Sequence, residues 1–439
     1  MFRKSVMLAT LFTLLSTTST LAQDDKLGLI IPNLYGPQGL FVQSDAPLAG
    51  GVDHSAHFNS SFQSEFTQFN IALASELSAL PLPSPASGFT YEFDAAAGAF
   101  TRTTQSFGPI LAERAETIGK GRFSFGFYFQ RFSFDSVEGL DLGSVPAVFT
   151  HDSAQLLGGR EDVVTTVNSI ETTVNQFTAF FTYGLGDQVD LSLGVPIVNT
   201  ELKVTSVATL QRLGTTDPAI HYYGEPGGTT RTFSDSGSAS GIGDIVARLK
   251  GTLAKSGGTG LALGVDVRFP TGDEEDLLGS GAFGLKPFAA LSFSHQRVSP
   301  HINLGYQWNG NSALASEFRF GASGAEFGEK EDLPDNFLWV FGVDFGAGER
   351  VTVIFDVIGT TIIDSPQLVE ETFTGLDAAA TTFDNIGFET ATFNIVNGAL
   401  GFKVNAGGNL LIDFNLLFKL NDAGLRDDLT PLIGIEYSF

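Results

Sequence analysis

Four charged residues on two neighbouring segments are the strongest candidates for chemistry in this chain. Asp244 and Arg248 are four residues apart, and Asp266 and Arg268 are two apart, so each pair falls on one face of a strand. If the segments form a hairpin, the four side chains make a cross-strand cluster of opposite charges. Inside a pore, such a cluster selects solutes by charge or hydrogen bonding. Alternatively, it fills a narrow lumen with salt bridges and fixes the strand register.

Other polar residues share the inward face that these charges define. His301 and Asn303 alternate with Ile302 and Leu304 in a later segment and extend the candidate constriction. Further polar residues at inward positions are Lys250, Gln307, Asp413, Asn415 and Lys419. A sheet with one charged face and one apolar face suits a barrel in lipid, with the charges in its lumen.

A run of four acids, Asp273-Glu274-Glu275-Asp276, occupies an expected connection between strands. Hard divalent cations prefer carboxylate oxygens, but the run lacks the spacing of an EF-hand loop. The favoured interpretation is a solvated loop, which cations can bridge to lipopolysaccharide phosphates.

Motifs for cofactors and catalysis are weak. The string over 279–284 matches G-x-G-x-x-G but enters an expected strand rather than a helix, which argues against a dinucleotide site. The six histidines, without any Cys, show no metal-ligand spacing. His295 follows Ser292 and Ser294, yet nothing marks an activated nucleophile. We expect no cofactor, no metal site and no enzymatic activity.

Period-two alternation of apolar residues predicts strands from residue 121 to the end. In the first strand, Phe123, Phe125, Phe127 and Phe129 share one face. About twelve segments recur at roughly 10–14 residues, which is the length that a tilted membrane strand needs. The alternative, a soluble β-sandwich, has strands of about 5–6 residues. The predicted fold is all-β, an antiparallel transmembrane β-barrel of about twelve strands over residues 121–439.

Short and long connections alternate between these segments. Barrels of the bacterial outer membrane have short turns in the periplasm and long loops outside. The short connections are 186–188, 255–259, 295–299, 346–350 and 406–408. The long ones are 135–169, 200–239, 271–283, 309–335, 363–391 and 420–429. This order places both ends of the predicted barrel in the periplasm.

The chain ends on an aromatic residue. Ile433, Ile435, Tyr437 and Phe439 share one strand face, and a strand that stops on Phe is unusual for a soluble domain. The ending resembles the closing strand of outer-membrane barrels, in which the barrel assembly machinery reads the terminal aromatic. The resemblance makes Tyr437 and Phe439 the expected assembly signal.

The chain begins with features of an export signal. Residues 1–22 combine Arg3 and Lys4, a short apolar stretch and small residues before a break, which predicts a cleaved signal peptide. The formal charge of −25 becomes −27 when these two cations are lost. A protein this acidic lacks the basic patch that nucleic acid requires.

The segment between the signal peptide and the barrel, residues 23–120, does not follow the strand pattern. Apolar residues at helical spacing predict an amphipathic helix over 62–80. Pro109 is expected to open a second short helix, which Gly119 closes. This partly helical segment is either a plug at the periplasmic mouth, the favoured interpretation, or a periplasmic extension.

Three motifs resemble a known family. They are S-G-x-G-D-I over 240–245, R-x-P-T-G-D over 268–273 and H-x-N-x-G-Y over 301–306. Their order is similar to that in outer-membrane barrels associated with the meta-pathway of phenol degradation, and the similarity is best over residues 175–310. The resemblance implies uptake of aromatic or hydrophobic compounds.

The leading interpretation is a monomeric outer-membrane channel or transporter for small solutes, with aromatic or hydrophobic solutes as the implied class. The alternative is a non-conducting barrel with a structural or surface-interaction role. The sequence does not separate the two, because lumen width depends on strand shear.

Overall fold

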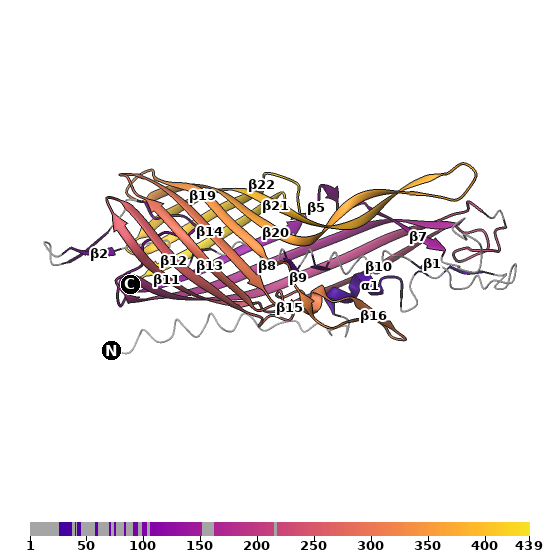
Figure 1. Cartoon of the computed structure of the whole chain (residues 1–439), viewed down its shortest axis with the longest axis horizontal. Helices are drawn as coiled ribbons and strands as arrows, with labels where there is room; N and C mark the ends of the chain where they lie inside the picture. Colours follow the sequence, from indigo (N-terminus) through magenta and orange to yellow (C-terminus); the bar gives the residue numbers. More distant parts are fainter. Residues whose placement is uncertain are drawn as a thin grey trace.

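Twelve antiparallel strands close into a barrel in the computed structural model (Figure 1). The structure describes residues 26–36, 40, 42–44, 58–59, 70–71, 74–75, 83–84, 91–94, 99–102, 106–151, 162–214 and 217–439. The barrel strands are β4 (Phe123–Phe134), β8 (Val163–Gly186), β9 (Val189–Gln211), β11 (Ile245–Ser256), β12 (Thr259–Phe269), β13 (Gly284–Phe293), β14 (Val298–Asn309), β19 (Asn336–Gly346), β20 (Val351–Thr374), β21 (Thr382–Gly407), β22 (Leu410–Lys419) and β24 (Leu429–Ser438). The barrel closes because β4 pairs with both β8 and β24. The predicted fold class is confirmed.

Shorter elements occupy the connections and the N-terminal segment. They are η1 (Leu27–Leu29), α1 (Ile30–Asn33), β1 (Phe58–Asn59), β2 (Tyr91–Asp94), β3 (Ala99–Arg102), β5 (Ser136–Val137), β6 (Leu140–Asp141), β7 (Val145–His151), β10 (Thr230–Ile242), β15 (Asn311–Ser312), η3 (Ala313–Ala315), β16 (Phe318–Gly321), β17 (Gly324–Phe327), β18 (Glu331–Asp332) and β23 (Leu425–Arg426). Among the described residues, no helix has the length and apolarity of a membrane-crossing helix. The expected signal peptide lies outside the described residues.

The outward face of the barrel is apolar, as the alternation predicts. Phe127, Leu193 and Ile433 point away from the lumen and are 46%, 41% and 52% exposed. So many large apolar side chains on a protein surface are favourable when they contact lipid instead of water. The short turns and the C-terminus lie at one end of the barrel. That end is called the periplasmic end here, and the opposite end is called the outer end.

Four strands extend far past the length that a membrane requires. β8, β9, β20 and β21 have 24, 23, 24 and 26 residues, against the roughly 9–11 that cross a bilayer. The predicted long connections 135–169, 200–239 and 363–391 are therefore wrong in part, because they contain β7, β10 and the outer ends of these four strands.

An apolar core lies at the outer end, and we call this part of the molecule the outer head. Residues 27–42 contribute Leu27, Ile30, Ile31, Leu34 and Tyr35, which pack against inward side chains of the extended strands. Helix α1 contacts β10 and β17 in this region (Figure 1). The sequence favoured a plug at the periplasmic mouth for residues 23–120, and that role stays a prediction. The described residues 26–36, 40 and 42–44 of this segment lie at the outer end, whereas residues 106–118 lie in the periplasmic half of the barrel. Helical spacing identifies an apolar face but gives no information about which end of the barrel covers it.

The two predicted N-terminal helices have different outcomes. Within 62–80, the described residues Asn70, Ile71, Ala74 and Ser75 are helical, and the remainder lies outside the described residues. The helix expected from Pro109 is wrong, because residues 106–118 contain none. Their backbone groups bond to side chains of the barrel wall instead of to one another.

Candidate functional site in the barrel lumen

A cavity of about 210 Å³ lies inside the barrel, and its walls differ in character. Strands β11 to β14 supply a polar wall, whose side chains include Arg248, Asp266, Arg268, Lys286, Asn303 and Gln307. Strands β19 to β22 supply a mainly apolar wall, on which Leu338, Val340, Ile358, Ile395 and Leu417 accompany the polar Thr360 and Asn397. The two walls adjoin where β14 pairs with β19, and β11 and β12 lie across the barrel from β21 and β22.

The centre of the polar wall is an ion pair between Arg248 and Asp266. The two residues are directly opposite in the β11–β12 register. Arg248 Nε donates to Asp266 Oδ1 at 2.6 Å, and Arg248 Nη2 donates to Oδ2 at 2.7 Å. Lys286 Nζ on β13 lies 3.0 Å from the same Oδ2. This bidentate geometry fixes the guanidinium plane, so that its remaining nitrogen faces the lumen.

The predicted four-residue cluster is divided into two groups. Arg268 and Asp244 lie nearer the outer end, with Arg268 Nε 3.8 Å from Asp244 Oδ2. Asp244 mainly organises the following loop, accepting from the backbone N–H groups of Gly272 at 3.1 Å and Ser280 at 2.8 Å. Arg268 Nη2 donates to Asn309 Oδ1 at 2.7 Å. We expect this outer pair to shape the cavity entrance and the Arg248–Asp266 pair to contact solutes.

An extended stretch of chain, residues 106–118, lies inside the periplasmic half of the barrel, and we call it the lumen loop. Barrel side chains hold its backbone: Phe107 N–H donates to Thr352 at 2.9 Å and Ala115 N–H to Ser292 at 2.9 Å. Ile118 N–H donates to Asp190 Oδ2 at 3.0 Å. A helix would use these N–H groups internally, so the wall contacts explain why none forms.

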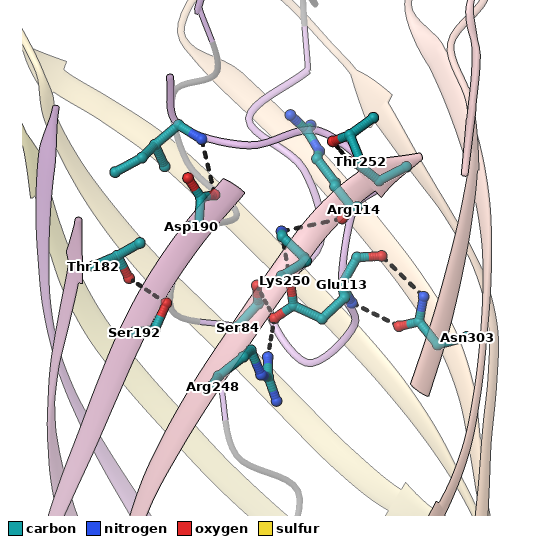
Figure 2. Close-up of polar contacts among 12 residues, drawn as sticks. Ser84, Glu113, Arg114, Thr182, Asp190, Ser192, Arg248, Lys250, Thr252 and Asn303 are labelled. Atoms are coloured by element: carbon teal, nitrogen blue, oxygen red, sulfur yellow. Dashed lines mark hydrogen bonds and ion pairs between the residues drawn. The ribbon is translucent and has the colours of Figure 1, made fainter. Parts of the chain in front are cut away.

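Glu113 joins the lumen loop to the polar wall (Figure 2). Its carboxylate accepts from Arg248 Nη1 and from Lys250 Nζ, the latter at 2.9 Å. Ser84 Oγ donates to the same carboxylate at 2.7 Å. The Asn303 side chain makes two hydrogen bonds with the Glu113 backbone, accepting from its N–H at 2.6 Å and donating to its C=O at 2.9 Å. Asn303 therefore positions Glu113 against the two cations.

His301 is buried among side chains of β19 and β20 and is not part of the cavity lining. It is buried between two carboxylates, with Nδ1 3.4 Å from Asp344 and Nε2 2.9 Å from Asp356. Arg114 of the lumen loop lies 3.6 Å from Asp344. This group holds the lumen loop to β19 and β20, so a solute in the cavity does not contact His301 directly.

Two neighbouring lysines pair with three acids of the outer-loop run, Asp273, Glu274 and Asp276. Lys26 Nζ lies 2.9 Å from both Asp273 and Asp276, and Lys330 pairs with Glu274. Partial burial acts to raise the pKa of Asp273, but the hydrogen bond and charge of Lys26 outweigh it and hold that pKa below its ordinary value. In the described part of the chain, no group of three or more His, Asp or Glu side chains has an arrangement that holds a metal.

Tyr437 and Phe439 lie at the periplasmic end on the lipid-facing side, 47% and 53% exposed. The backbone of Phe439 pairs with Phe123, each N–H donating to the other's C=O at 2.9 Å. Their rings stack with centroids 5.8 Å apart. The last residue is thus part of the barrel seam, and its role in assembly stays a prediction.

Sequence reasoning placed Lys250 at an inward position but outside the cluster, and it missed Lys286 and Glu113. Lys286 also occupies an inward position, so strand parity alone could have added both lysines to the cluster. Glu113 had no such signal. Its partners are on β11 and β14, far away in sequence, and an extended segment buried on every side shows no periodicity.

Comparisons with known proteins identify the family resemblance. Residues 152–327 match the family model described as "Putative MetA-pathway of phenol degradation". This match confirms the resemblance predicted from the three motifs. No curated protein has a sequence that matches this chain.

Solved structures with a similar fold include outer-membrane channels. A channel from Pseudomonas putida F1 has 12% sequence identity and a TM-score of 0.44, covering 75% of this chain and 99% of that one. The toluene transporter TbuX of Ralstonia pickettii has 13% identity and a TM-score of 0.35, covering 81% and 99%. These similarities concern the fold alone. The protein is an antiparallel β-barrel of the bacterial outer membrane.

Proposed function

We propose that the protein is an outer-membrane channel for small solutes that combine an apolar, often aromatic, body with one polar group. The observation that carries the proposal is the two-walled cavity. Ile395 on β21 and Leu417 on β22 lie across a space of about 210 Å³ from Arg248 and Asp266, while Val340 lies beside Asn303. An apolar body gains free energy against the first wall, about 25 cal/mol for each Å² it buries, while a polar group finds partners on the second.

The two ends of the cavity define the path that a solute must take. On the outer side, Phe132, Phe134 and Leu278 belong both to the cavity lining and to the core of the outer head. On the periplasmic side, Leu111 and Glu113 of the lumen loop form the floor. We propose that the lumen loop is the plug of the channel and that a solute passes when this loop moves.

The alternative is a non-conducting barrel with a structural role. The outer head and the lumen loop on either side of the cavity favour it, because they narrow the path through the barrel. The two functions differ in one respect: a channel must pass ions or solutes when its plug is disturbed, and a structural barrel must not.

Single-channel recording of the purified protein in planar bilayers tests the proposal. We expect brief, rare openings in the unmodified protein. A variant with residues 110–115 replaced by glycine is expected to open frequently. A matched variant with glycine at the exposed outer turn 377–380 is expected to behave like the unmodified protein. Silence of the 110–115 variant, with a folded barrel shown by heat-modifiable gel mobility, would support the structural role.

A further inference from the structure

We infer that Arg248 and Lys250 form a binding site for the carboxylate of a small amphipathic solute, which Glu113 occupies in the resting protein. The inference rests on the proposed channel and names the chemistry of its solute. It starts from the position of the two cations. Both are on β11 and point into the lumen, where Lys250 Nζ contacts Glu113 Oε2 and Arg248 contacts Oε1 (Figure 2).

The charges around the cavity floor balance only while Glu113 is in place. Arg248, Lys250 and Lys286 are three cations, and Asp266, Glu113 and Asp190 are three carboxylates, with Asp190 directly opposite Lys250 in the register. Removing the Glu113 carboxylate would leave an excess of one positive charge. Lys250 is only 2% exposed, and although it also donates to the Arg114 C=O at 3.1 Å, the loss of an ion pair by a buried cation is costly. An anion in the place of Glu113 would restore the balance.

The residues of the lumen loop near this anion site resemble a bound solute. Leu111 and Glu113 are two residues apart, and both line the cavity. Leu111 packs with Val340, Ile358 and Leu417 of the apolar wall, while Glu113 meets the cations. An apolar group on one side and a carboxylate on the other is the chemistry that a small aromatic carboxylate would present to the same walls.

Binding would thus replace the Glu113 carboxylate with the carboxylate of the solute. The incoming carboxylate accepts the hydrogen bonds from Arg248 Nη1 and Lys250 Nζ, and the Glu113 side chain gives them up. The lumen loop then keeps its backbone contacts with Asn303 and Ser292 but loses its two ion pairs to β11. Binding loosens the plug without requiring it to leave, so binding and passage are separate steps.

Calorimetric titration of the purified full-length protein in detergent tests the inference, with benzoate as the probe. Benzamide has the same shape without the charge, and acetate has the charge without the ring. We expect benzoate to bind at least about tenfold more tightly than either, since charged hydrogen bonds are the stronger ones. Equal binding of benzoate and benzamide would overturn the inference.

Three variants identify the site. Glu113→Gln is expected to bind benzoate about tenfold more tightly, because the resident competitor is gone. Lys250→Met is expected to bind it at least about tenfold more weakly. The control is Glu116→Gln, an acid of the same loop for which the described contacts include no ion pair with Arg248 or Lys250. If Glu113→Gln leaves the affinity of benzoate unchanged, the assignment fails.

The outcome is separable from that of the proposed function. Benzoate binding without any current in bilayers would support the site and contradict the channel. Current without selective benzoate binding would support the channel and contradict the site. If Glu113→Gln does not fold, the double variant Glu113→Gln/Lys250→Met restores the charge balance. The comparison of benzoate with benzamide on the unmodified protein decides the question in any case.

Discussion

The β8–β9 hairpin passes through two environments, and its faces exchange character between them. In the membrane part, outward residues such as Phe181 and Leu193 are apolar. Farther out, the same face carries Glu171 and Lys203, which form an exposed ion pair at 2.6 Å. The backbone pairing keeps one register from Val163 to Gly184, through both parts. The alternation of apolar and polar residues therefore depends on whether lipid or water surrounds the sheet, and not on the backbone pairing.

The exchange occurs at one pair of residues. Asn175 and Asn199 are directly opposite in the register, and Asn175 Nδ2 donates to Asn199 Oδ1 at 3.2 Å. Beyond them, inward residues such as Ile170 and Val204 join the core of the outer head. We place the outer boundary of the membrane at this pair. Where lipid surrounds the barrel, apolar side chains point outward and polar ones point into the lumen. Where water surrounds it, polar side chains point outward and apolar ones point inward.

Truncating the core of the outer head should have the largest effect. Phe149 is fully buried, and its ring meets Tyr35 edge to face at 5.1 Å. Phe149→Ala should destabilise the outer head by about 3–5 kcal/mol through lost burial and an unfilled cavity. Amide hydrogen exchange should accelerate over residues 163–174 and not over 177–186.

The matched control is Phe177→Ala on the lipid-facing side of β8, where Phe177 is 47% exposed. Lipid fills the space that this substitution leaves, so the loss should be smaller. Equal acceleration of exchange in both parts of β8 after Phe149→Ala would show that the outer head and the membrane part unfold as one unit.

A charge on the outward face should discriminate the two environments directly. Leu193 and Val207 share that face of β9 and are 41% and 39% exposed. Leu193→Arg should cost about 2–4 kcal/mol, because it places a cation in lipid. Val207→Arg should change stability by less than about 0.5 kcal/mol, because it faces water. Denaturant titration of folding into lipid vesicles measures both, and similar costs would move the boundary away from Asn199.

A smaller effect is expected at alkaline pH in the outer head. Burial is the main cause that raises the pKa of Tyr35 to about 12, although its hydrogen bond to Ser206 acts in the opposite direction. In the unfolded chain this phenol ionises near pH 10. The contribution of the buried, neutral Tyr35 to the stability of the outer head is therefore complete below pH 10 and is lost as the pH rises toward 12. The loss should reach about 2–3 kcal/mol.

The readout is a fluorescent dye at Ser44→Cys, which labels one position because the chain has no Cys. Denaturant titrations at pH 9 and pH 12 give the stability of the docked segment. Tyr35→Phe should reduce the alkaline loss, and an unchanged loss in that variant would assign the effect to another group.

The membrane strands were predictable because lipid imposes one rule on all twelve. Every outward position in the bilayer is apolar, and the terminal aromatic and the order of short and long connections agree with that rule. The sequence predicts loops for the outer extensions of β8 and β9, because the apolar positions change face at Asn175 and Asn199. A pattern of apolar residues at every second position is broken where the apolar face changes, so the predicted strand ends there.

The candidate site was predictable only where strand geometry determines it. Parity placed Arg248 and Asp266 together, and the register confirms that they are directly opposite. Nothing in the sequence places Glu113 between Arg248 and Lys250, because the lumen loop has no period and touches strands from distant parts of the chain. The same burial on all sides made residues 109–118 look like an apolar helix.

The most direct test of the account is a reversible lock on the lumen loop. A Cβ at Gly260 would lie 2.9 Å from that of Ala115, and a shift of about 0.6 Å brings the pair to the ~3.5 Å at which disulfides begin. We predict that Ala115→Cys/Gly260→Cys shows no openings in planar bilayers when oxidised. Adding reductant to the same membrane should restore the openings of the unmodified protein. Openings of equal frequency with the disulfide in place would contradict the claim that this loop closes the channel.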